Sequence, residues 1–189
     1  MHYLRSTEVF IGDVTRWCSA SPSSGNTGIV GRTDTASLMI AAPLSRVYAA
    51  LVEAQALVEW LPPHGMSGKF EHFDARPGGT YRMRLTYAEP PESGGKSSGD
   101  SDVVAARFVQ IVPDDRVVQA VDFESDDPSF AGTMTMTWAV TAVSAGSTRV
   151  DIRADDVPPG ISVDDHLDGL RSSLANLAAY LTGRRADQD

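Results

Sequence analysis

The chain has 189 residues, of which 42% are hydrophobic and 22% charged, proportions that are ordinary for one globular domain. Its net charge of −9 at pH 7 repels phosphate groups, so we expect neither general nucleic-acid binding nor attachment to an anionic membrane surface. The single cysteine, Cys18, excludes an internal disulfide and a cysteine-based zinc site, and no run of about 18 apolar residues is present to span a membrane. The first residues do not resemble a secretory signal, so we expect a cytoplasmic protein.

The first 31 residues differ in composition from the rest of the chain. Residues 19–28 are small or polar and include proline and glycine, so this stretch has no apolar face to bury. We therefore expect residues 1–31 to form a poorly ordered extension, residues 32–183 to form the folded domain, and residues 184–189 to form a tail.

The folded part is expected to begin with a strand and two short helices. Thr33–Ala41 is typical of a strand, and Pro43 suits the first turn of a helix in which apolar residues recur at helical spacing. A second helix, Ala54–Trp60, ends before Pro62-Pro63, because a residue that precedes proline resists the helical conformation.

A run of strands follows these helices. We expect strands at Met66–Phe73, Thr80–Tyr87, Asp102–Val112, Arg116–Glu124, Thr133–Val143 and Ser147–Ala154, with a mobile loop at Glu89–Asp100. Apolar and polar residues alternate in the second, fifth and sixth of these, which indicates an antiparallel sheet with one face in solvent. Arg82 and Arg84 fall on the polar face, where we expect them to pair with acidic neighbours such as Asp151.

A long helix at Asp164–Gly183 completes the domain. It has a leucine stripe along one side, acidic residues at its start and a glycine at its end, as expected for a capped helix that covers a sheet. The predicted fold is α+β: an antiparallel sheet curved around the long C-terminal helix, with two short helices after the first strand.

Several short motifs, in this order along the chain, resemble those of the SRPBCC (START-like) superfamily. They are Ile40-Ala41-Ala42-Pro43, Leu57-Val58-Glu59-Trp60, Pro77-Gly78-Gly79, Phe108–Pro113 and Val157-Pro158-Pro159-Gly160. Within that superfamily the chain is similar to single-domain bacterial members of the branch named for the activator of heat-shock-protein ATPase. The resemblance implies a helix-grip (START/Bet v-like) fold.

A sheet wrapped around a helix commonly leaves an apolar cavity between the two layers. The expected ligand-binding residues are Trp60, Met66, Phe70, Tyr81, Met83, Tyr87, Phe108, Val121, Phe123, Met134, Met136 and Trp138 from the inner face, with Leu170 and Leu174 above them and His166 at the mouth. The alternative is that these residues simply form a packed core.

Two histidines are the only candidate catalytic residues. His64 follows Pro63 in a loop and His166 lies in the first turn of the last helix, so both are expected at the cavity mouth. There they would form a general acid–base pair, with Asp164 or Asp165 nearby. The alternative is that both are separate surface histidines. We expect no metal site and no cofactor, because the spacing of these residues matches no known metal-binding signature.

The leading functional hypothesis is binding of a small apolar or amphipathic molecule, such as a lipid, a polyketide or an aromatic metabolite. The first alternative is a cyclase- or hydrolase-type enzyme that uses a cavity-mouth histidine, and we expect binding rather than catalysis. The second is a protein-binding module in the style of the chaperone-associated relatives, which predicts an exposed apolar patch. A homodimer would cover an open edge of the sheet.

Overall fold

The structure is a computed structural model that describes residues 31–88, 101–122 and 127–183. Some sequence expectations lie outside these described residues: the N-terminal extension apart from Gly31, the loop Glu89–Asp100, the end of the predicted strand Arg116–Glu124 with the ligand-binding candidate Phe123, and the tail at 184–189.

The described elements follow the expected order of a strand, two short helices, a run of strands and a closing helix. They are β1 (Arg32–Ile40), α1 (Leu44–Val52), α2 (Ala54–Trp60), β2 (Met66–Phe73), β3 (Thr80–Tyr87), β4 (Ser101–Val112), β5 (Arg116–Asp122), the short 3-10 helix η1 (Pro128–Phe130), β6 (Thr133–Ser144), β7 (Ser147–Val157) and α3 (Val163–Thr182).

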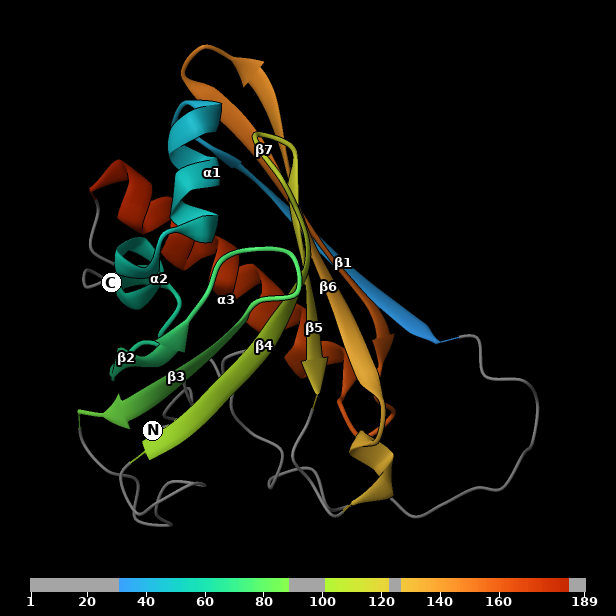
Figure 1. Cartoon of the computed structure of the whole chain (residues 1–189). Coiled ribbons are helices and arrows are strands. Elements are labelled where there is room, and N and C mark those ends of the chain that lie inside the picture. Colours follow the sequence, from blue (N-terminus) through green and yellow to red (C-terminus); the bar gives the residue numbers. More distant parts are fainter. Residues whose placement is uncertain (1–30, 89–100, 123–126, 184–189) are drawn as a thin grey trace, which may run out of the picture.

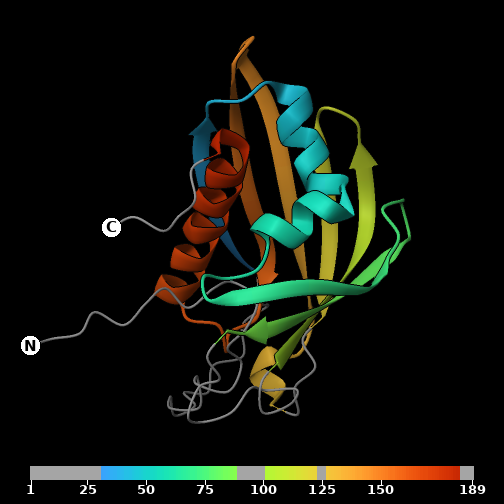
Figure 2. The ribbon, with the colours of Figure 1, turned by 90° about the vertical axis from the view of Figure 1, so that its left-hand side faces the viewer.

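The described strands form one antiparallel sheet in the order β1-β7-β6-β5-β4-β3-β2. Each strand from β2 to β6 pairs with the next strand along the chain, and β1 pairs with β7, so β1 and β2 are the two edges. Figure 1 shows the sheet curved, with the three helices on its inner side. Figure 2 shows α3 lying beside α1 and α2 across that inner side. The predicted α+β helix-grip fold is confirmed.

The closing helix α3 is defined by its caps and by its apolar stripe. The Ser162 hydroxyl accepts a hydrogen bond from the backbone N–H of Asp165 at 3.3 Å, and Gly183 ends the helix with a left-handed φ of 68°. Leu170, Leu174 and Leu177 are 0%, 2% and 0% exposed, so the predicted stripe faces the sheet.

The short helices fix one end of the core. Trp60, at the end of α2, donates a hydrogen bond from its indole N–H to the carbonyl oxygen of Ala50 in α1 at 2.9 Å. Its ring meets that of Trp138 on β6 edge to face, with 5.5 Å between the ring centres. Both tryptophans are buried, so they join the two short helices to the middle of the sheet.

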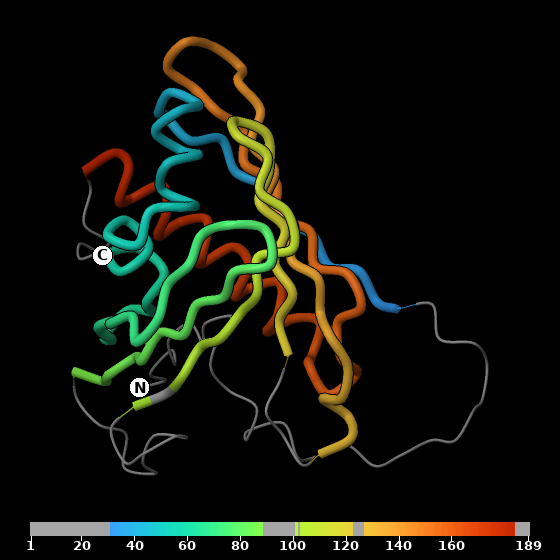
Figure 3. Tube along the Cα trace, viewed as in Figure 1, coloured from blue at the N-terminus to red at the C-terminus, as the bar shows by residue number. Residues whose placement is uncertain are grey.

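Strand β7 extends three residues beyond the predicted end at Ala154. The apolar–polar alternation stops at Asp155-Asp156, and Asp156 has a left-handed φ of 58°, so the pattern signalled an end where the strand continues. Gly31 lies against this irregular point, where a Cβ would collide with the carboxylate of Asp156. The Cα trace in Figure 3 shows the β6–β7 hairpin projecting at one end of the sheet, with η1 at the other end.

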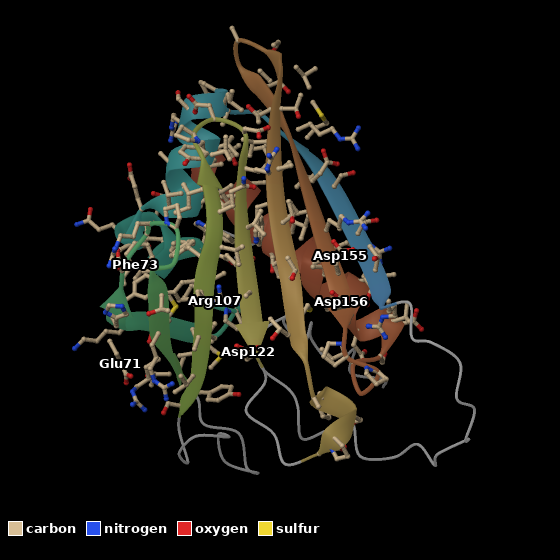
Figure 4. All side chains as sticks on the ribbon, turned by 45° about the vertical axis from the view of Figure 1, so that its right-hand side comes forward. Glu71, Phe73, Arg107, Asp122, Asp155 and Asp156 are labelled. Carbon is tan, nitrogen blue, oxygen red and sulfur yellow. The ribbon has the colours of Figure 1, made fainter. Side chains whose placement is uncertain are left out.

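The outer face of the sheet is polar, as expected, but the predicted partner of Arg82 and Arg84 is wrong. Both arginines bind Glu71 on β2, at 3.1 Å and 2.6 Å, because β2 is the strand next to β3. Asp151 pairs with Arg149 on its own strand. In Figure 4 the labelled Glu71 and Asp155 lie toward opposite ends of this face.

No helix among the described residues is long and apolar enough to cross a membrane.

Candidate functional site

The layer between the helices and the sheet contains most of the predicted ligand-binding residues. A single buried hydrophobic cluster includes Trp60, Tyr81, Met83, Phe108, Met134, Met136, Trp138, Leu170 and Leu174. Met66, Phe70 and Val121 are partly buried and pack against it, and Tyr87 is partly buried at the end of β3. Their position is as expected, and their role in ligand binding stays a prediction.

Four aromatic rings form one wall of this layer. Tyr81 on β3 lies 5.6 Å from Phe108 on β4 and 5.7 Å from Phe70 on β2, measured between ring centres. Phe73 completes the group, 4.7 Å from Phe70. Desolvation of the Tyr81 hydroxyl raises its pKa above the ordinary value, so this phenol stays protonated at neutral pH.

One polar residue on the inner face, Gln119 on β5, was missed by the sequence analysis. It lies directly opposite Phe108 on β4 and Met136 on β6. Its side chain is 8% exposed, whereas Phe108 and Met136 are 0% and 1% exposed. The sequence contains a signal for this position, because alternation in β5 places Gln119 on the same face as Val121, one of the predicted ligand-binding residues.

A second buried polar group lies where α3 begins. The Nδ1–H of His166 donates a hydrogen bond to Oδ2 of Asp34 at 2.6 Å, and the two side chains are 3% and 6% exposed. The guanidinium of Arg32 lies 2.9 Å from the same carboxylate oxygen and also donates to the carbonyl oxygen of Ile161, in the loop before α3. This cluster ties edge strand β1 to the start of α3.

The expected acid–base pair of His64 and His166 is not formed. His64 is exposed in the turn between α2 and β2, while His166 is buried. Figure 1 shows that turn on the left of the molecule and the start of α3 on the lower right. The carboxylate beside His166 is Asp34, rather than Asp164 or Asp165, because those two project into solvent from the first turn.

Comparison with known protein families finds a match over most of this chain. The family described as "Activator of Hsp90 ATPase homolog 1-like protein" matches residues 41–182. The chain belongs to this family. The predicted membership of the SRPBCC superfamily, in the branch of the heat-shock-protein ATPase activator, is thereby confirmed.

Solved structures agree with membership of the Hsp90-activator-like family. A crystal structure of a protein from Chromobacterium violaceum has 30% sequence identity, covers 79% of this chain and 96% of that chain, and has a TM-score of 0.65. An AHSA1-like protein from Aeromonas hydrophila has 13% identity, covers 82% of this chain and 99% of that chain, and has a TM-score of 0.60, a likeness that shows the fold alone. No curated protein matches the sequence.

In this Hsp90-activator-like chain, burial lowers the pKa of His166, and the Asp34 carboxylate offsets only part of that effect. The unfolded state therefore binds this proton more tightly than the folded state. Hence the contribution of His166 to the free energy of unfolding is fully present above about pH 6.5 and falls as the pH drops towards the lower pKa of the folded state. Urea unfolding, followed by circular dichroism between about pH 7.5 and 5, measures this dependence.

Comparison with variants isolates the contribution of His166 from that of the carboxylates. His166→Gln should flatten the fall in stability below about pH 6.5, whereas His64→Gln, the same change at an exposed histidine, should leave it as in the original chain. An unchanged slope in His166→Gln would contradict the assignment.

Proposed function

We propose that this protein binds a small apolar or amphipathic molecule in the layer between α3 and the sheet. The observation that carries the proposal is the composition of that layer. Met83, Met134 and Met136 are at most 1% exposed and lie in one cluster with Trp60, Trp138, Tyr81 and Phe108. Methionine is unbranched and flexible, so these walls can rearrange around an apolar guest more easily than a layer of branched residues.

The position of α3 supports the same proposal. The backbone of α3 comes closest to β1, which is one edge of the sheet, and to α2, which packs against β2 at the other edge. Long side chains fill the layer between α3 and the central strands. Repacking those side chains does not require α3 to leave β1, so a guest can be accommodated while the Asp34–His166 contact stays in place.

The test is whether apolar compounds stabilise the folded protein. A panel of lipids, polyketides and aromatic metabolites is screened by thermal unfolding, and co-purified compounds are sought by native mass spectrometry. A true ligand at one hundred times its Kd should add about 2.7 kcal/mol to the free energy of unfolding. For a chain of this length that corresponds to a rise in Tm of roughly 5–10 °C.

A pair of matched variants shows whether binding takes place in the proposed layer. Met134→Phe with Met136→Phe enlarges two inward side chains of β6 and should abolish the stabilisation. Thr135→Phe with Thr137→Phe introduces the same two residues on the outer face of the same strand and should preserve the stabilisation. If no compound stabilises the protein, or if both double variants respond alike, the proposal fails.

Catalysis receives less support from the same cluster of residues. The contact with Asp34 fixes the tautomer of His166, as acid–base catalysis would require. However, Arg32 binds the same carboxylate and also holds the loop before α3, which is the arrangement of a structural clamp. We therefore do not propose an enzymatic activity.

Protein partners remain predictions. Among the described residues, the exposed large hydrophobic side chains are spread over four elements: Leu38 and Met39 on β1, Val109 on β4, Val143 on β6, and Val163 and Tyr180 on α3. This distribution does not favour one apolar docking patch for a chaperone. For the predicted homodimer, β1 is the better edge, because it exposes Leu38 and Met39, whereas β2 contains Lys69, which discourages strand pairing.

A further inference from the structure

We infer that the outer face of β2, β3 and β4 is a docking surface for a short, extended acidic segment of a partner protein. Four basic side chains define this surface, which we call the basic face: Lys69 on β2, Arg82 and Arg84 on β3, and Arg107 on β4. Figure 4 shows this side of the sheet, with Arg107 labelled. The apolar layer beneath α3 lies on the other side, so the basic face is a separate surface from the proposed ligand site.

The basic face has more positive charge than its own acidic residue balances. That residue is Glu71, whose carboxylate accepts hydrogen bonds from Arg84 at 2.6 Å and from Arg82 at 3.1 Å. These hydrogen bonds hold the pKa of Glu71 below its ordinary value, so Glu71 is ionised at neutral pH. By contrast, Lys69 and Arg107 form no ion pair within the described part of the chain. Four cations and one acid leave three positive charges here, in a protein whose net charge is −9.

The strand register places like charges next to each other on the basic face. Lys69 lies directly opposite Arg84, and the residue opposite Arg82 is His72 rather than an acid. Like charges directly opposite each other destabilise an antiparallel pair, and an acidic residue at position 69 would remove that repulsion. The arrangement therefore costs stability in the chain alone, and a bound anionic segment offsets the cost.

The spacing of the cations matches that of an extended peptide. Side chains on one face of a strand repeat at about 6.8 Å, which is the step from Arg84 to Arg82 along β3. The next step along β3 is Thr80, which lies directly opposite Arg107 on β4. Arg84 also donates to Ser101 Oγ at 3.2 Å, which helps to fix its guanidinium. Alternate residues of an extended peptide repeat at the same distance, so carboxylates at every second residue can meet successive cations.

The surroundings of the basic face favour a short acidic segment over a longer polyanion. Asp122 on β5 and Asp155 on β7 follow on the same side of the sheet, as Figure 4 shows, so charge that extends beyond the four cations is repelled. A nucleic acid or an anionic membrane extends in this way. Bases would also lack a stacking surface, because no exposed large hydrophobic side chain on the described parts of β2, β3 and β4 is aromatic. At physiological ionic strength, charges more than about 8 Å away are screened, so a short segment interacts mainly with the basic face itself.

The test compares two peptides of equal length and charge by NMR titration of the isotope-labelled protein, which detects binding with a Kd of about 1 mM. One peptide alternates, Ser-Glu-Ser-Glu-Ser-Glu-Ser, and the other has its glutamates together, Ser-Ser-Glu-Glu-Glu-Ser-Ser. We expect amide shifts on β2, β3 and β4, and about threefold tighter binding of the alternating peptide. The reason is that all its carboxylates point to one side, whereas the second peptide directs one of them away from the cations.

Two double variants with the same change in net charge show whether the basic face is responsible. Lys69→Gln with Arg107→Gln removes the two cations that form no ion pair and should weaken binding of the alternating peptide about fivefold. Arg149→Gln with Arg153→Gln removes two cations from β7 on the same side of the sheet, where each pairs with an aspartate. This control should change the affinity by less than about twofold, because these cations lie several strands away. Thermal unfolding checks that both double variants are folded.

The contrary outcomes are specific. The inference is overturned if neither peptide binds, if the two peptides bind equally tightly, or if the two double variants lose the same affinity. Tighter binding to phosphatidylserine-containing vesicles or to a single-stranded oligonucleotide than to the alternating peptide would also overturn it, because the basic face would then recognise a different polyanion. The proposed binding of an apolar molecule between α3 and the sheet stands or falls independently of these results.

Discussion

Replacing Asp34 with alanine should lower the free energy of unfolding by about 3 kcal/mol, at the lower end of the range for removing one member of a buried ion pair. The Asp34 carboxylate is 6% exposed, accepts the Nδ1–H of His166 at 2.6 Å and lies 2.9 Å from the Arg32 guanidinium. Alanine would leave an imidazole donor and a partly buried cation without the acceptor that both share. Urea unfolding at pH 7.5, where His166 is neutral, measures the loss.

The matched control is Asp151→Ala on the outer face. Asp151 pairs with Arg149 at 2.8 Å, but both side chains are well exposed, at 37% and 54%, so its removal should cost less than about 1 kcal/mol. Asp34→Asn keeps an acceptor for the His166 N–H and should fall between the two alanine variants. If Asp34→Ala cost no more than Asp151→Ala, the cluster would not be the clamp between β1 and α3.

The features that the sequence predicted depend on local periodicity. Apolar and polar residues alternate along β3 and along most of β6 and β7, and the leucines of α3 recur at helical spacing, so the buried faces of these elements were predicted correctly. The boundaries of α3 were right to within one residue, because acidic residues mark the first turn and Gly183 is a strong C-terminal cap. Inner-face positions in these elements were accordingly placed correctly.

The features that were not predicted from the sequence depend on contacts between distant segments or on breaks in the apolar–polar pattern. Asp34 and His166 are 132 residues apart, and a single aspartate in an otherwise ordinary strand gives no sign of its partner. Arg82 and Arg84 pair with Glu71 because β2 lies next to β3 in the sheet. The alternation of apolar and polar residues within a strand does not show which strands are neighbours. Gln119 is different, because the alternation of β5 alone places it on the inner face.

Leu174→Ala should also lower the free energy of unfolding by about 3 kcal/mol, within the range of 2–5 kcal/mol for a fully buried leucine. Leu174 is 2% exposed and belongs to the cluster that joins α3 to the sheet, so truncation removes apolar contacts and leaves a cavity. Urea unfolding followed by circular dichroism measures the loss. The matched control is Leu38→Ala on edge strand β1. Leu38 is 36% exposed, so this truncation should lower the free energy of unfolding by less than about 1 kcal/mol.

The two leucine variants together test the premise behind both the fold and the proposed ligand site. A ligand held between α3 and β3–β6 requires α3 to close the apolar face of the sheet, so a residue on its inward stripe must contribute like a core residue. A loss at Leu174 as small as that at Leu38 would mean that the helix is only loosely attached. The methionines and aromatic rings of the sheet would then not be covered by α3, and an apolar ligand would not be shielded from water.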